Sequence, residues 1–188
     1  MRKNAFETPE KYEDYANGMG RRALQSYKKF GYIPLEDPVK EAFHKREQTA
    51  RTLEYAFDDF VLAQVAKKLN KTADYDSLIA RSYNYRNVID PKTSYANGRY
   101  ESGEFYEETK PNFFAFYITE GAPCHYTWYV PHDPYGLMKS MGGKDMYIAR
   151  LDTLFEEKYY WHGNEPCHQV AYLYNYVGQP WKTQKYTR

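Results

Sequence analysis

One acidic side chain stands out because of the residues around it. Glu120 lies in the stretch ITEGAPCHYTWYVPHD, residues 118–133, and Gly, Ala and Pro follow it directly, so a turn is expected here. Aromatic residues surround it in the sequence: Tyr117, Tyr126, Trp128 and Tyr129. An aromatic pocket would desolvate the charged carboxylate and raise its pKa, as a general acid requires. The alternative is a surface glutamate that caps a turn or forms an ion pair.

A second stretch, YYWHGNEPCHQVAYLYNYVG at residues 159–178, gathers polar groups at the expected start of a helix. Asn164 can cap this helix, and Glu165 then lies in the first turn, where the helix dipole favours negative charge. Pro166 fits there because its missing N–H would be unpaired anyway. His162, Asn164 and Glu165 could therefore face a shared cleft. An ordinary capped helix is the alternative, but it leaves the YYWH segment unexplained.

These two stretches also contain side chains that could bind a metal ion. The candidates for zinc are Cys124, His125, His162, Glu165, Cys167 and His168. Their order matches neither of the helical His–Glu zinc motifs, and there is no C-x-x-C pair. Calcium, which prefers carboxylate and amide oxygens, fits Asn164 and Glu165 better. Whether the two cysteines are bonded stays open.

A weaker signal comes from the stretch YAFDDF, which places Asp58 and Asp59 side by side in an expected helix. Adjacent residues diverge by about 100° on a helix, so at most one of them can face a cleft. The other is expected on a solvated face. No phosphate-binding loop, dinucleotide fingerprint or nucleophile elbow is present.

Amphipathic helices are expected to position these side chains. Apolar residues between Arg46 and Asn70 recur at helical spacing, and a second helix is expected from Asp74 to Asp90, ended by Pro91. The short turn between the two favours an antiparallel pair. Further helices are expected at residues 12–31, from Pro134 with Asp133 as its cap, and at 144–157, 164–178 and 180–188. Residues 91–111 are expected to form a long loop. The predicted fold class is all-α, built from helical hairpins.

Bulk composition excludes several classes of protein. The 188 residues fit one domain, and 26 basic against 25 acidic residues give no electrostatic case for binding nucleic acid or an anionic membrane. No apolar run approaches the roughly 18 residues of a membrane span, and no secretion signal follows Met1. With 22 Tyr, 10 Phe and 3 Trp, the chain is rich in rings suited to half-wet clefts or to helix packing.

Several blocks, in order along the chain, resemble the calcium-dependent α-mannosidases of glycoside hydrolase family 92. They are GYIPLED, TLEYAFDDF, YNYRNVIDP, ITEGAPCHYTWYVPHDPYGLMKSMGG, LDTLFEE and HGNEPCHQVAYLYNYVGQPWKTQ. Members of that family carry a β-sandwich domain followed by an (α/α)6 toroid, and they remove terminal α-linked mannose with inversion. The resemblance implies that residues 1–188 are an incomplete (α/α)6 catalytic domain, without the β-sandwich domain and the segment that carries the general base.

The resemblance also implies roles for particular residues. Glu120 would be the general acid, and His162, Asn164 and Glu165 would line the sugar site, with Asn164 and Glu165 as calcium ligands. Further candidates for sugar contacts are His125 and Asp59. Many relatives have EGNAWQYTW where this chain has EGAPCHYTW, and some α-1,2-specific relatives have Glu at the position of Gly163, so contacts and linkage preference need not be shared.

The same resemblance implies a binding partner and a cellular localisation. The partner would be a mannose-containing glycan, and the parent protein would be secreted or periplasmic. Because the family's base lies downstream of the GQPWKTQ block, we expect no hydrolysis of mannosides by this chain alone. The alternative from another class is a helical scaffold that binds peptides, although no repeat of about 33 to 47 residues recurs.

Overall fold

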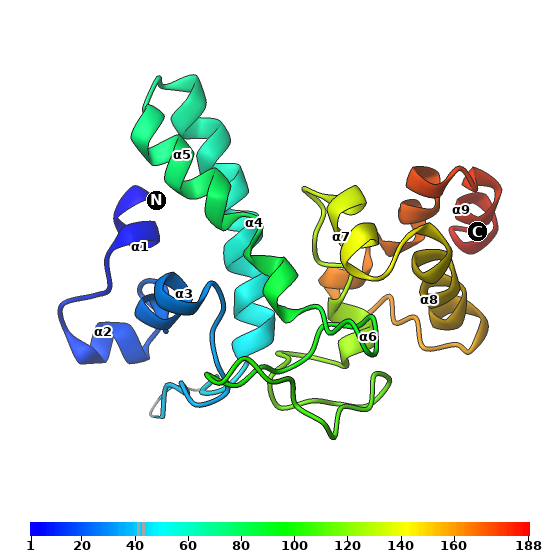
Figure 1. Cartoon of the computed structure of the whole chain (residues 1–188), viewed down its shortest axis with the longest axis horizontal. Coiled ribbons are helices and arrows are strands. Elements are labelled where there is room, and N and C mark those ends of the chain that lie inside the picture. Colours follow the sequence, from blue (N-terminus) through cyan, green and yellow to red (C-terminus); the bar gives the residue numbers. More distant parts are fainter. Residues whose placement is uncertain (41, 43) are drawn as a thin grey trace.

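The computed structural model describes residues 1–40, 42 and 44–188, and these residues form helices and loops without a β-strand (Figure 1). This confirms the predicted all-α fold class. The α-helices are α1 (Arg2–Phe6), α2 (Tyr12–Ala16), α3 (Leu24–Phe30), α4 (Gln48–Lys68), α5 (Thr72–Arg81), α6 (Pro123–Tyr126), α7 (Pro134–Ser140), α8 (Lys144–Glu156) and α9 (Pro180–Tyr186). The 3-10 helices are η1 (Asn84–Val88), η2 (Glu165–Cys167) and η3 (Val170–Val177).

The hairpin of α4 and α5 is the central element and was predicted from the sequence. It stands between α1–α3 on one side and α6–α9 on the other (Figure 1). Asn70 adopts a left-handed conformation with φ 55°, which ends α4 and lets α5 return beside it. The second helix is shorter than predicted, since α5 ends at Arg81 and η1 follows. Ser82 stops it locally by donating its hydroxyl to the Ile79 carbonyl, at 2.7 Å.

The N-terminal prediction of one helix over residues 12–31 is wrong, because the chain forms α2 and α3 with a break between them. Gly18 and Ala23 have positive φ angles of 75° and 53° in this break. The Arg22 side chain fixes it by donating from Nη2 to the Ala16 carbonyl, at 2.6 Å. The predicted stop at Gly31, with φ 74°, is confirmed.

The C-terminal elements agree with the prediction in position and differ in type. Asp133 caps α7 as expected, accepting a hydrogen bond from the Gly136 N–H at 2.9 Å. The expected α-helix at residues 164–178 is instead η2 and η3, ended by Gly178 with φ 73°. Asn164 does not cap it through its side chain, which is engaged elsewhere.

Tyrosine rings form much of the interior. The largest fully buried side chains include Trp128, Tyr27, Tyr85, Tyr147 and Tyr174. Several buried hydroxyls find partners; the Tyr174 hydroxyl, for example, donates to Asp152 at 2.9 Å. Many of the tyrosines therefore serve packing rather than ligand binding. Among the helices of the described residues, none is both long and apolar enough to cross a bilayer.

Candidate active site

The two polar stretches singled out in the sequence lie against each other. Asn164 donates from Nδ2 to the Glu120 carbonyl at 2.7 Å, and His125 Nε2 lies 2.8 Å from the Tyr159 carbonyl. Helix α6, directly after Glu120, packs against η2. The turn at Glu120 depends on Gly121, where a Cβ would lie 2.8 Å from His125 Nδ1. Two loops that are remote in sequence are thus joined by hydrogen bonds at one place.

A cavity of about 650 Å³ opens between these loops and α4. Its lining combines acidic, amide and aromatic side chains: Glu54, Phe57, Thr119, Glu120, Tyr126, Tyr129, Pro131, Asn164, Glu165, Pro166 and Gln169. Glu120 and Glu165 therefore converge on one aromatic-lined concavity. Both side chains are exposed, so the enclosed, desolvated carboxylate expected at Glu120 is not found there.

The desolvated carboxylate of this cavity belongs to Glu54 on α4. Burial, together with the negative charges of Asp58, Glu47 and Glu120, raises the pKa of Glu54 to about 7, while Arg51 acts in the opposite direction. The sequence analysis missed this residue because it considered only the aspartates of the same helix. One signal was available: Glu54 lies three residues before Phe57, a spacing that places both on one face of a helix. In the structure both residues line the cavity.

Asn164 is almost completely buried, with 2% of its surface exposed. Its Nδ2 is used by the Glu120 carbonyl, and a hydrogen bond from its side chain partly offsets the burial that raises the pKa of Tyr126 to about 12. Among the residues that the structure describes, its Oδ1 has no hydrogen-bond partner, and neither does the buried Nε2 of Gln169. A buried polar atom without a partner costs about 1–3 kcal/mol, so these two atoms call for a polar partner, which an ordered water or a ligand can supply.

The donor set at this place is one of oxygens. Within the described part of the chain, no three His, Cys, Asp or Glu side chains are close enough to hold a metal ion together, so the zinc alternative gains no support. Asn164 Oδ1 has no partner among the described residues, and Glu165, the next residue in the chain, lines the same cavity. Amide and carboxylate oxygens are ligands that calcium accepts, so these residues fit such an ion.

His162 lies beside the cavity without lining it. Its exposed ring stacks on His168 with centroids 4.6 Å apart, and its Nδ1 is 2.7 Å from the Tyr160 hydroxyl. His125 uses both ring nitrogens within the chain, since Nδ1 accepts from the Ala122 N–H at 3.1 Å and Nε2 faces the Tyr159 carbonyl. His125 therefore joins the two loops, and neither of its ring nitrogens is free to bind a sugar.

Asp59 lies away from the cavity, contrary to the expectation of a sugar contact. It is fully buried and paired with Arg21 Nη1 and Arg81 Nη2, both at 2.6 Å. Its neighbour Asp58 is the exposed member of the pair. The reason is the rotation of α4, which turns residue 59 toward the arginines of the N-terminal half.

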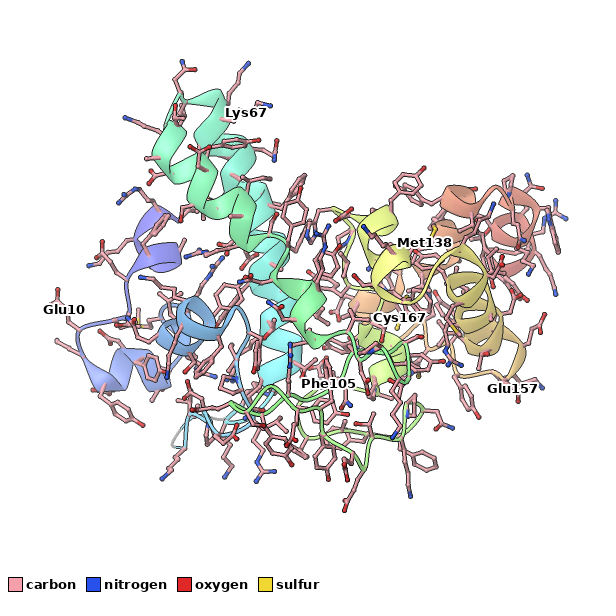
Figure 2. The ribbon with its side chains drawn as sticks, viewed as in Figure 1. Glu10, Lys67, Phe105, Met138, Glu157 and Cys167 are labelled. Atoms are coloured by element: carbon pink, nitrogen blue, oxygen red, sulfur yellow. The ribbon has the colours of Figure 1, made fainter. Side chains whose placement is uncertain are left out.

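Cys124 and Cys167 are both free thiols buried behind the cavity. Burial raises the pKa of Cys124 to about 12 and that of Cys167 to about 11. Cys167, labelled in Figure 2, has no exposed surface and lies on η2, which packs against α6. As neutral thiols they act as packing groups here.

Comparison with known proteins matches residues 1–188 to the family described as the glycosyl hydrolase family 92 catalytic domain. An uncharacterized secreted glycosidase of Arthroderma benhamiae is 30% identical over 185 residues, which cover 86% of this chain and 24% of that protein.

Solved structures agree with this match. The family GH92 α-mannosidase BT3965 of Bacteroides thetaiotaomicron is 41% identical with a TM-score of 0.79, over 93% of this chain and 23% of that one. Its complex with mannoimidazole gives a TM-score of 0.81, with 37% identity over 93% of this chain and 25% of that one.

The family GH92 inverting mannosidase BT2199 of Bacteroides thetaiotaomicron VPI-5482 is 34% identical with a TM-score of 0.79, over 89% of this chain and 25% of that one. The chain thus spans about a quarter of the length of each of these relatives. With its whole length matched to the family and its fold shared with solved members, the chain belongs to glycoside hydrolase family 92 and is part of that family's catalytic domain.

Proposed function

We propose that this chain provides the proton-donating and sugar-binding side of an inverting exo-α-mannosidase that removes terminal α-linked mannose from glycans. The observation that carries the proposal is the hydrogen bond from Asn164 to the Glu120 carbonyl, 2.7 Å long, at the edge of a cavity that both residues line. The α-mannosidases named among its relatives support the substrate class. A peptide-binding scaffold has no need to bring these side chains together.

Glu120 is the proposed general acid. A sugar that fills the cavity removes water from around its carboxyl group, which favours the neutral acid. The proton then passes to the glycosidic oxygen as the bond from that oxygen to the anomeric carbon breaks, and the leaving group departs as an alcohol. Water adds to the anomeric carbon from the opposite face and loses its proton to a base.

Glu54 lies on the same cavity and has a different task in this proposal. With a pKa of about 7, it is partly protonated near neutral pH and can donate or accept a hydrogen bond. A mannose ring offers hydroxyl groups on every side. We therefore assign Glu54 to a hydroxyl of the terminal sugar and not to the bond that breaks.

Asn164 Oδ1 and the Glu165 carboxylate are the proposed calcium ligands. When bound, calcium would orient sugar hydroxyls and stabilise negative charge beside the ring. Without an ion or a sugar, Asn164 Oδ1 keeps its buried lone pairs unpaired. Its amide Nδ2 meanwhile fixes the Glu120 loop in place.

The general base is proposed to lie in another part of the family's domain, where helices like these close into an (α/α)6 toroid. The 188-residue chain is then expected to bind mannosides and not to hydrolyse them. Measurable calcium-dependent turnover by this chain would contradict that assignment of the base. The parent protein is proposed to be secreted or periplasmic, in line with its secreted relative.

The test is stabilisation of the chain by its ligands in differential scanning calorimetry. Calcium and mannoimidazole together should raise the unfolding temperature, because a ligand that binds only the folded state stabilises it. Asn164→Ala should abolish the increase, whereas Asn175→Ala, an exposed asparagine on η3, should preserve it. An increase that is unaffected by Asn164→Ala, or by a calcium chelator, would refute the proposed site.

A further inference from the structure

Trp161 is an exposed aromatic residue at the rim of the candidate site. It lies in the link between α8 and η2, and 49% of its surface is exposed. Its ring centroid is 6.3 Å from that of His125, which follows the Glu120 turn. It is not among the residues that line the 650 Å³ cavity. The indole is therefore next to both loops of the site, yet outside the space proposed for the terminal sugar.

The indole of Trp161 lies against Gly163, where there is no side chain. A Cβ at Gly163 would lie 2.4 Å from Trp161 Nε1 and 2.9 Å from Cε2, closer than real contacts allow. Gly163 is not one of the glycines with a positive φ, so its backbone conformation does not call for glycine. A side chain at position 163 would displace the indole from this place.

The backbone is held on both sides of Trp161. On one side the Tyr160 N–H donates to the Leu154 carbonyl at 2.8 Å, and on the other His168 Nε2 lies 3.0 Å from the His162 carbonyl. A hydrogen bond with the Trp161 backbone also reaches the buried Cys167 and opposes the rise of its pKa. An exposed ring on a fixed backbone loses little conformational entropy when a ligand covers it.

We propose that Trp161 is the platform for the sugar ring on the leaving-group side of the bond that is cleaved. This inference rests on the proposed function. Glu120 delivers its proton to the oxygen between two sugars, and Trp161 adjoins the Glu120 turn through His125 but lies beyond the cavity. The face of an indole suits the C–H face of a pyranose, while the sugar hydroxyls stay in water. The substrate class is mannosides whose leaving group is itself a sugar.

Isothermal titration calorimetry with calcium present tests this with two kinds of ligand. Methyl α-mannoside fills only the terminal-sugar site, whereas an α-linked mannobiose also covers the platform; each linkage is titrated separately. For at least one linkage the native chain should bind the mannobiose more tightly. Trp161→Ala should weaken that binding about three- to tenfold and leave methyl α-mannoside unchanged. Gly163→Ala should have the same effect, because the methyl group displaces the indole.

Two variants serve as controls. Trp161→Phe keeps a ring and should retain part of the preference for mannobiose. Trp181→Ala removes another exposed indole, 58% exposed on α9, and should change nothing. Equal affinity of the native chain for both ligands, or equal weakening of both by Trp161→Ala, would overturn the platform alone. If the native chain binds neither ligand, the proposed function fails and the platform fails with it.

Discussion

Two carboxylates on α4, those of Asp59 and Glu54, have very different surroundings. Asp59 is fully buried, and both of its oxygens are bound by guanidinium groups. Glu54 is partly buried beside the cavity, and burial, together with the acidic groups around it, raises its pKa. Five residues separate the two, which is about 140° around a helix, so they lie on different faces. On the Asp59 face the carboxylate has its ion-pair partners within the protein, whereas the Glu54 face borders the cavity.

The comparison extends to the surroundings of each residue. The Asp59 side contains Arg21, Arg81 and the Tyr27 hydroxyl, which lies 3.4 Å from the carboxylate. The Glu54 side contains Asn164 Oδ1 and Gln169 Nε2 without partners. Unpaired buried atoms also occur away from the cavity, as at Gln48 Oε1. Such an atom alone does not identify a site; two of them among the carboxylates of one cavity support the proposed one.

The largest expected effect is that of Asp59→Ala on stability. It removes the carboxylate that both guanidinium groups share, so that Arg81 loses its ion-pair partner and Arg21 keeps only the exposed Asp58, which should cost about 3–5 kcal/mol in urea unfolding. Asp58→Ala is the matched control. Asp58 is exposed and comes no closer than 3.7 Å to Arg21 Nη2, so its loss should cost under about 1 kcal/mol. Similar losses for the two variants would contradict the distinction between a structural and an open face.

Local sequence signals predicted the parts of the fold that are decided locally. The spacing of apolar residues gave the α4–α5 hairpin, Asp133 was identified as a cap, and Gly31 and Gly178 as stops. The break between α2 and α3 was missed, although Gly18 lies in it with a positive φ. Arg22 holds the break through the nearby Ala16 carbonyl and also through the distant His44 carbonyl, at 3.1 Å, and the spacing of apolar residues reports neither contact.

The candidate site was predicted in part, for a related reason. The residue types at Glu120, Asn164 and Glu165 indicated a cleft, and these three do line one cavity. Asp59 was expected at the sugar and does not line that cavity, whereas Glu54 was not considered and does, because helical periodicity separates faces without saying which neighbour each face meets. Burial of Glu54 depends on how the loops of residues 119–131 and 164–169 pack on α4, which only the folded chain shows.

A second prediction concerns how stability depends on pH. The pKa of Glu54 rises from an ordinary value of 4.5 to about 7 on folding, so the folded state binds more protons between these values. Its contribution therefore becomes unfavourable as pH rises from about 4.5 through 7, by roughly 3 kcal/mol at most. Glu54→Gln should be stabilising relative to the native chain at pH 8 and nearly neutral at pH 4.5.

A second group, His132, also makes stability depend on pH, and its effect has the opposite sign to that of Glu54. Burial among aromatic rings lowers its pKa, so its contribution to stability is lost as pH falls below its ordinary value of 6.5. The native chain responds to both groups, and only the difference between native and Glu54→Gln chains isolates residue 54. A difference that does not vary from pH 4.5 to 8 would show that Glu54 is not desolvated.

The smallest expected effect tests the unpaired amide at the cavity. Gln169→Met keeps nearly the same volume and removes the buried Nε2 that has no partner, so the free chain should become more stable by about 1 kcal/mol. If that amide serves a ligand, the same variant should bind mannoimidazole more weakly, and the two changes should oppose each other in calorimetry with and without the ligand. The exposed Gln184 on α9, replaced by Met, is the control and should alter neither quantity. A Gln169→Met chain that is destabilised would mean that Gln169 has a partner inside the fold, and the contrast between the two faces of α4 would then rest on Glu54 and Asn164.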